Sequence, residues 1–388
     1  MKKRIALIRG PGLNSWETQM YSPLMDTYEL VGFVSQSRYF DISSIPFEVR
    51  KLFSVGRFLS ARILRKPMVQ ILGDYHDLQH LKPALRDFDL VHCLDPMYYC
   101  TYQSARAKQG AHFKLVLTVW ENIPFLHHNG AAARHKEVIF DQADLMLTVS
   151  ERTKEVLLLE GAPPEKVKVL MPGIDISHFR PMHKNPDLLR RFDCRDGDLI
   201  ILYVANLYRE KGIFDLLYAF RALLTRWNAG SKIKLLIAGK GREKENISSW
   251  IRRLHLDNEA HLIGSHSYDL MPGIHNLADV FVLPSIPMRK WQEQFGYVLV
   301  ESMACGKPVI STRSGSIPEV VGDAGVLVQP NDFVSLGGAL EQLLLDDDLR
   351  KQYGARARLR AEGLFDAQKV SGKLRSLFDG LLHSREET

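Results

Sequence analysis

Two series of short apolar runs constrain what this chain can fold into. In each series the runs are rich in β-branched residues and alternate with longer amphipathic stretches, a pattern that predicts strands and helices in turn. The runs are continuously apolar, which is typical of parallel strands covered by helices on both faces. The expected strands are residues 4–8, 30–34, 90–93, 114–119, 145–149 and 167–171 in the first series, and 199–204, 232–238, 261–263, 280–283, 308–311 and 326–328 in the second.

The two series predict two domains of similar size. The chain has 388 residues, which is long for one compact core. Pro172-Gly173 and Pro181 interrupt the pattern between the series, so we expect a linker near residues 172–197. The predicted fold class is α/β, with two Rossmann-like, doubly wound domains at residues 1–180 and 197–365. These domains are expected to face a central cleft, because open α/β sheets bind ligands outside the carboxyl ends of their strands.

Composition places the chain among ordinary folded proteins, since 45% of its residues are hydrophobic and 25% are charged. Its four cysteines are scattered without CxxC pairs, which argues against structural zinc and a disulfide framework. No apolar run reaches the roughly 18 residues of a membrane span, and the first apolar stretch is too short for a signal peptide. We therefore expect a cytoplasmic protein. Its net charge of +6 leaves nucleic acid, an anionic membrane or a phosphorylated substrate open as partners.

The most informative stretch begins at Glu293 and reads as a loop, a helix, a turn and a strand. Gly296 lies where the loop enters the helix, so the N–H groups from Phe295 to Tyr297 are expected to hold a pyrophosphate, helped by the helix dipole. Glu301 lies about one and a half turns into that helix. Ionised carboxylates accept hydrogen bonds from sugar hydroxyls, so both glutamates are candidate binding residues. The alternative is a pair of exposed glutamates beside an ordinary helix.

Here the chain resembles the retaining glycosyltransferases of family 4. Their E-x7-E signature matches Glu293 and Glu301, and further family motifs occur in the family's order over about residues 167–330. These motifs are Pro172-Gly173-Ile174-Asp175 with Phe179 and Pro181, Glu210-Lys211-Gly212, Leu236-Ile237-Ala238-Gly239-Lys240-Gly241, Ala278-Asp279-Val280-Phe281-Val282-Leu283-Pro284-Ser285, and Gly315-Ser316-Ile317-Pro318-Glu319-Val320.

The resemblance implies a GT-B fold and a transferase that retains the anomeric configuration without a required metal or other cofactor. A nucleotide-diphosphate sugar is expected to bind mainly to the second domain, with Glu293 on the sugar hydroxyls and Glu301 on the ribose. The expected acceptor is a hydroxyl of a glycan or of a lipid-linked molecule. In this fold the amphipathic C-terminal helix, at about residues 366–388, crosses back to join the first domain.

Further residues are assigned to the donor site by the same resemblance. Lys211 matches the lysine that neutralises the donor diphosphate, a role that suits an anionic leaving group. Asn206 stands where the family usually has an arginine and cannot supply its charge. Arg209 is a candidate replacement, although it could equally lie on another side of the turn. Gly239 and Gly264 match turns that approach the phosphates and the base.

The first domain offers fewer candidates. Gly10 and Gly12 follow the first strand and resemble the family's glycine-containing loop, which reaches toward the donor phosphates; alone they would be an ordinary turn. Many family members carry a histidine after the fourth expected strand, where this chain has Trp-Glu. Glu121 is therefore the third candidate catalytic residue beside Glu293 and Lys211. His127 or His128 is the alternative if the loop folds back.

Basic charge is concentrated in residues 47–68, where six Lys or Arg are interleaved with apolar residues. This basic amphipathic segment predicts attachment to an anionic membrane surface at the inner face of the membrane. The alternative is a solvated helix whose apolar face packs on the first domain. No nucleic-acid-binding motif supports a nucleic-acid partner. The competing functions are a nucleotide-sugar epimerase or phosphorylase on the same scaffold, or a non-enzymatic membrane-binding module.

Overall fold

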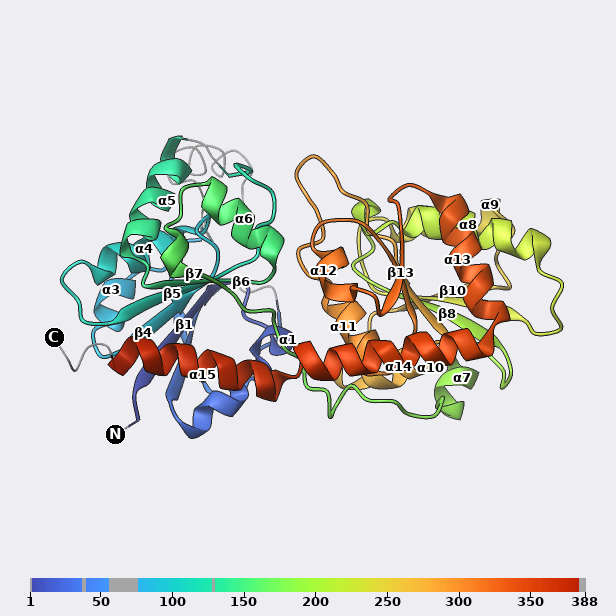
Figure 1. Ribbon diagram of the computed structural model, residues 1–388, viewed down its shortest axis with the longest axis horizontal. Helices are drawn as coiled ribbons and strands as arrows, with labels where there is room; N and C mark the ends of the chain where they lie inside the picture. The colour runs from blue at the N-terminus through green and yellow to red at the C-terminus, as the bar shows by residue number, and fades with distance from the viewer. Residues whose placement is uncertain (1, 37–39, 56–75, 128–129, 384–388) are drawn as a thin grey trace. The chain divides into compact units, whose positions relative to one another are not determined.

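The computed structural model describes residues 2–36, 40–55, 76–127 and 130–383. The chain divides into two compact units, Met1–Gly173 with Ala367–Thr388, and Ile174–Asp366. Each unit contains one parallel sheet between helices, as Figure 1 shows. The prediction of two Rossmann-like α/β domains is confirmed.

The first unit is built on a sheet in which the described strands follow the order β3-β2-β1-β4-β5-β6-β7, and each strand is parallel to its neighbours. The first strand, β1, lies inside the sheet, and the later strands are added outwards, first to one edge and then to the other, as in doubly wound folds. The strands are β1 (Arg4–Gly10), β2 (Glu29–Ser35), β3 (Glu48–Leu52), β4 (Leu90–Cys93), β5 (Lys114–Val119), β6 (Leu145–Thr148) and β7 (Val167–Val169).

Helices cover both faces of this sheet (Figure 1). Side chains alternate along β1, so Ala6 and Ile8 join the core under α3 to α6, whereas Ile5 and Leu7 join the core under η1 and α15. The structure therefore places the C-terminal helix in the first unit. The helices are α1 (Ser15–Thr18), η1 (Ser22–Asp26), α3 (Leu81–Ala84), α4 (Tyr99–Lys108), α5 (Gly130–Gln142), α6 (Glu151–Leu159), η3 (Pro164–Lys166) and α15 (Ala367–His383).

Strand β3 corrects the interpretation of the basic segment 47–68. Residues 48–52 form a parallel edge strand, so this part of the segment is not an amphipathic helix. Phe47 is buried in the core beside it. The pattern of apolar runs misses β3 because an edge strand is half exposed and tolerates charged residues. Of the rest of the segment, residues 56–68 lie outside the described residues.

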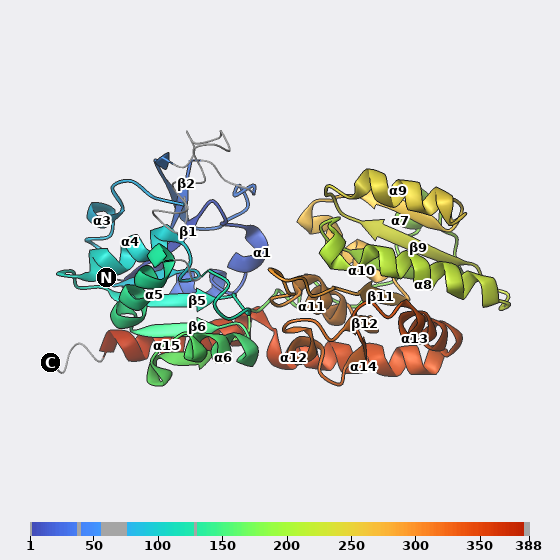
Figure 2. The same ribbon diagram turned by 90° about the horizontal axis from the view of Figure 1, so that it is seen from above.

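The second unit repeats the plan. Across residues 174–366, all of which are described, the strand order is β10-β9-β8-β11-β12-β13, again parallel throughout. Seen from above, α7 and α9 lie on the side of the unit that carries β9, and α12, α13 and α14 lie on the side that carries β12 (Figure 2). The strands are β8 (Leu199–Val204), β9 (Ile233–Ala238), β10 (Ala260–Gly264), β11 (Val280–Leu283), β12 (Val309–Thr312) and β13 (Gly325–Val328).

Two helical layers enclose the second sheet. Helix α8 contacts α9 and α13 on one face, while α10 contacts α7 and α11, and α11 contacts α14. No helix within the described part of the chain is long and apolar enough to cross a bilayer. The elements are α7 (Pro186–Arg191), η4 (Arg209–Lys211), α8 (Ile213–Arg226), α9 (Lys244–Arg253), η5 (Tyr268–Leu270), α10 (Met271–Leu277), α11 (Tyr297–Ala304), α12 (Ile317–Val321), α13 (Phe333–Leu345) and α14 (Asp347–Leu364).

The expected linker at 172–197 and the expected end of the first domain at residue 180 are wrong, because the second unit begins at Ile174. Helix α7 lies within this segment and packs on α10. Lys184 anchors the same segment further, since the Nζ atom of Lys184 lies 2.6 Å from the Asp279 carboxylate. The prolines and glycines of this stretch mark turns inside a folded segment, not a boundary between domains.

The packing of α15 gives a stability test. Phe378 is fully buried, with its ring edge-on to the rings of Tyr28 and His92. Phe378→Ala should lower the free energy of unfolding of the first unit by about 3–5 kcal/mol, because it leaves a cavity in the core. Urea unfolding monitored by circular dichroism measures this loss. The control Lys373→Ala, on the exposed face of α15, should change it by about 0.5 kcal/mol or less. Equal losses in both variants would contradict the packing.

Candidate functional site

The order of the second sheet reverses between β8 and β11, which are direct neighbours. Successive connections leave these strands in opposite directions, and open α/β sheets bind ligands at the carboxyl ends of such a pair. Residues 205–212 follow β8, and residues 284–296 follow β11. The two loops bring together Lys211 and Glu293, whose Nζ and Oε2 atoms are 2.7 Å apart. Two residues that the sequence singles out thus meet where the fold is expected to bind a ligand.

The Lys211–Glu293 pair is largely withdrawn from solvent, since its side chains retain 18% and 8% of their exposure. Ser285 Oγ donates a hydrogen bond of 2.8 Å to the same oxygen of Glu293. The Lys211 ammonium also lies 4.6 Å from the centre of the Trp291 ring. A carboxylate and an aromatic face both favour a cation, so the ammonium is held in a defined position.

Two glycines allow the loops of the site to approach this closely. Gly212 has a φ of +72°, and a Cβ atom there would lie 1.8 Å from the carbonyl oxygen of Pro284. Gly315, with a φ of +55°, would place a Cβ atom 2.0 Å from the carbonyl oxygen of Glu293. Any other residue at either position would push the loops apart.

Gly296 starts the helix that carries the second glutamate. It has a φ of +87° and caps α11. The Phe295 ring is 1% exposed and packs edge-on against the rings of Tyr297 and Phe365. Phe295 therefore anchors the loop in the core, while Gly296 turns the chain into the helix.

Glu301 is buried in α11, with 3% of its surface exposed. Its Oε1 accepts a hydrogen bond of 2.9 Å from the hydroxyl of Tyr268, and its Oε2 lies 3.3 Å from Nε2 of His275. The alternative of an exposed glutamate is excluded for both Glu293 and Glu301. Sequence reasoning missed Tyr268 and His275, which carry no motif of their own.

The other expected donor residues of this unit lie on neighbouring loops. Gly239 N–H donates to the carbonyl of Gly264 at 2.8 Å, which ties the loop after β9 to the end of β10. Asn206 is exposed on the loop after β8. Arg209 lines a pocket of about 180 Å³ together with Asp215. Burial raises the pKa of Asp215, and the positive charge of Arg209 opposes this shift. The structure thus gives Arg209 an acidic neighbour on α8.

In the first unit, the glycine loop rests on a buried ion pair. Gly10 has a φ of +53°, and Gly12 N–H donates to the carbonyl of Arg9 at 2.9 Å. Arg9 is 3% exposed, and its Nε lies 3.3 Å from Oε1 of Glu17. Its Nη2 also donates to the hydroxyl of Tyr21 at 2.8 Å. Glu17 is therefore a structural residue that supports the loop.

Glu121 belongs to a loop whose backbone is fixed by carboxylates. Oδ1 of Asp95 accepts hydrogen bonds from the N–H groups of Trp120 and Glu121, at 2.7 and 2.9 Å. Oε1 of Glu121 accepts from Ile123 N–H, and its Oε2 lies 3.7 Å from Nε2 of His127. Burial raises the pKa of Glu121. The structure brings Glu121 and His127 together, whereas residue 128 lies outside the described residues.

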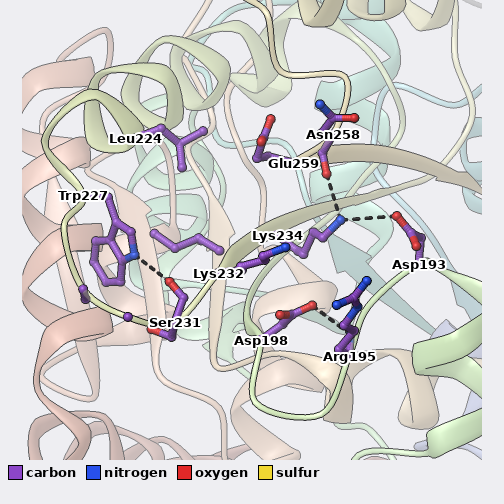
Figure 3. A pocket seen from close by; sticks show the side chains of 13 residues that line it. Asp193, Arg195, Asp198, Leu224, Trp227, Ser231, Lys232, Lys234, Asn258 and Glu259 are labelled. Atoms are coloured by element: carbon purple, nitrogen blue, oxygen red, sulfur yellow. Dashed lines mark hydrogen bonds and ion pairs between the residues drawn. The ribbon is translucent and has the colours of Figure 1, made fainter.

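A pocket of about 620 Å³ lies at the opposite, amino ends of the strands (Figure 3). Asp198, Lys232 and Glu259 in its lining directly precede β8, β9 and β10. Within the lining, Lys234 Nζ donates to the Asp193 carboxylate and to the carbonyl of residue 258 (Figure 3). We place the candidate site at the carboxyl ends, because the Lys211–Glu293 pair lies there. In the described part of the chain, no cluster of three or more His, Cys, Asp or Glu could hold a metal ion.

Asp95 predicts a pH dependence of stability. Burial raises the pKa of this carboxyl to about 7, although two backbone N–H groups favour its ionised form. Since this pKa lies above the value of about 4 expected in the unfolded chain, the group's contribution to stability falls as the pH rises from about 4 to 7, by at most about 1.4 kcal/mol per pH unit. In Asp95→Asn this contribution is absent. The unfolding free energy of the wild type, measured relative to that of the variant by urea unfolding, should therefore fall as the pH rises from about 4 to 7. A difference that stays constant over this range would contradict the prediction.

Two family models match the chain. Residues 48–178 match the model described as Glycosyltransferase Family 4, and residues 186–360 match the model described as Glycosyl transferases group 1. N-acetyl-alpha-D-glucosaminyl L-malate synthase of Bacillus anthracis is 27% identical over 75% of this chain and 74% of that protein. The capsular polysaccharide biosynthesis glycosyltransferase CapM of Staphylococcus aureus is 27% identical over 65% of this chain and 65% of that protein.

A solved structure shares the fold over almost the whole chain. Anabaena Alr3699/HepE in complex with UDP superposes with a TM-score of 0.79 at 18% identity and covers 97% of this chain and 100% of that one. The two family models together span most of the sequence between residues 48 and 360. The chain belongs to the group 1, family 4 type glycosyltransferases of GT-B fold.

Proposed function

We propose that the chain transfers a sugar from a nucleotide-diphosphate sugar to an acceptor hydroxyl with retention of the anomeric configuration. The observation that carries this proposal is the buried Lys211–Glu293 ion pair at the switch point of the second sheet. A diphosphate needs a cation there, and a sugar ring needs hydrogen-bond acceptors beside that cation. The pair supplies both.

In this reaction Lys211 stabilises the negative charge that builds up on the departing nucleoside diphosphate. Glu293 accepts hydrogen bonds from hydroxyls of the transferred sugar. In the structure the two side chains neutralise each other, and Ser285 holds the carboxylate in place. On binding, the ammonium of Lys211 moves from Glu293 to the diphosphate and supplies positive charge there without a metal ion.

The remaining candidate residues are divided between the nucleotide and the acceptor. Glu301 binds the ribose, and the loops containing Asn206, Gly239 and Gly264 border the nucleotide. In the first unit, Glu121 orients the acceptor hydroxyl, and burial raises the pKa of this carboxyl above its ordinary value. The relatives include a capsular polysaccharide glycosyltransferase, which supports a cell-envelope glycan or its lipid-linked precursor as acceptor. Transfer to such an acceptor would take place at the cytoplasmic side of the membrane.

Nucleotide binding tests this proposal. Calorimetric titrations with UDP, GDP and ADP, in buffer containing EDTA, should show binding of at least one diphosphate; UDP is tested first because the fold relative was solved with it. Lys211→Met and Glu301→Ala should each weaken binding by about 10- to 100-fold, since each removes a charged hydrogen-bond partner. The control Lys351→Met removes an exposed lysine of α14 and should bind like wild type.

Absence of binding to all three diphosphates would overturn the proposal. Binding that appears only after a divalent cation is added would overturn its metal-free form. Thermal unfolding of each variant, followed by circular dichroism, separates a lost contact from a lost fold, because Lys211→Met leaves the carboxylate of Glu293 buried without its counter-ion.

Peripheral membrane binding through residues 47–68 is part of the proposal. The charge of this segment supports it, since each basic residue near an anionic surface contributes about 1 kcal/mol. The protein should float with vesicles that contain anionic lipid and should remain in the soluble fraction with neutral vesicles. Changing Arg62 and Arg65 to Glu should reduce flotation severalfold. Equal recovery in the soluble fraction with both kinds of vesicle would contradict it.

A further inference from the structure

The carboxylate of Glu301 is contacted at both oxygens by side chains from other elements. Tyr268 in η5 donates its hydroxyl hydrogen to Oε1 at 2.9 Å. His275 in α10 places Nε2 at 3.3 Å from Oε2. Glu301 is 3% exposed and His275 is fully buried, so the contacts are shielded from bulk water. The position of this carboxylate is therefore set by its two neighbours as well as by α11.

The two neighbours are themselves held by aromatic packing. The ring of Phe179 lies 5.4 Å from the ring of Tyr268 and 5.9 Å from that of His275, edge-on to both. His275 also packs 5.5 Å from the ring of Phe281 in β11. Phe179 is fully buried, and its carbonyl accepts a hydrogen bond of 2.9 Å from Arg358. Neither neighbour can turn away from Glu301 without disturbing this packed cluster.

The contacts leave a defined part of the carboxylate for a ligand. An ionised carboxylate has about four lone-pair directions. Tyr268 occupies one on Oε1, and His275 faces Oε2 without meeting hydrogen-bond geometry in the described structure. Such contacts tighten when a ligand binds. The remaining directions, one on each oxygen, suit two hydroxyls on adjacent carbons, as in the 2′,3′-diol of a ribose.

We propose that Tyr268 and His275 are positioning residues that aim the carboxylate of Glu301 at a ribose diol, and that they thereby set the preference for ribonucleotides over deoxyribonucleotides. This inference rests on the proposed function, because it presupposes a nucleotide at Glu301. A site built to bond a hydroxyl discriminates strongly against the analogue that lacks it, since its polar groups are then left unpaired.

The test compares UDP, 2′-deoxy-UDP and 3′-deoxy-UDP by calorimetry, with the GDP or ADP series in their place if wild type binds that base. Wild type should bind the ribonucleotide at least about tenfold more tightly than either deoxy analogue. Tyr268→Phe and His275→Leu should weaken binding of the ribonucleotide about tenfold and leave the deoxy analogues nearly unchanged, so the ratio of dissociation constants falls toward one. His275→Gln keeps an N–H donor and should restore part of the ratio.

Tyr353→Phe, which removes a hydroxyl on α14, is the matched control and should keep the wild-type ratio. An unchanged ratio in Tyr268→Phe and His275→Leu would overturn the inference. It would be overturned equally if both variants weakened all nucleotides by the same factor, because that is the effect of a purely structural role. Failure of wild type to bind any nucleoside diphosphate would instead overturn the proposed function itself, so the two failures are distinguishable.

Discussion

The ion pair between Lys211 and Glu293 is the interaction on which the candidate site of the second unit depends. The reversal of strand order between β8 and β11 brings their two loops to one edge of the sheet, and Gly212 lets the loops touch. Removing one partner of a buried pair leaves a charge without compensation, which costs about 3–5 kcal/mol. This cost does not arise in the structure, because each group is the counter-ion of the other. In the proposed reaction, the donor diphosphate contacts the ammonium and the sugar hydroxyls contact the carboxylate.

Much of the fold was predictable because parallel strands buried on both faces must be continuously apolar. Twelve expected strands correspond to strands of the structure, and β4, β5, β8 and β11 agree with the expected ranges at both ends. The edge strand β3 was missed because its charges hide the pattern. The segment 174–196 was misread as a linker, since prolines and glycines mark turns whether they lie between domains or within one.

The site was predictable only where a motif has fixed spacing. Glu293, Glu301 and Lys211 stand in matched segments, and the structure buries both glutamates and pairs Lys211 with one of them. Tyr268 and Trp291 could not be found in this way. Tyr268 contacts Glu301 although 33 residues of sequence separate them, because η5 packs on α10 and α10 packs on α11. Such a contact cannot be predicted from the local spacing of residues.

The 120–127 loop of the first unit is organised differently from the Lys211–Glu293 site. At that site side chains pair with side chains. In the 120–127 loop carboxylates bind the main chain: Asp95 fixes two N–H groups at its start, and Glu160 accepts the N–H of Phe125 at 2.8 Å. Glu160 is in turn buried against Lys136, 2.6 Å away. Phe125 has a φ of +58°, a conformation that a side chain of this size adopts only when its surroundings impose it. The entropy of ordering the loop is therefore lost when the chain folds, so under the proposed function an acceptor at Glu121 would not have to order it again.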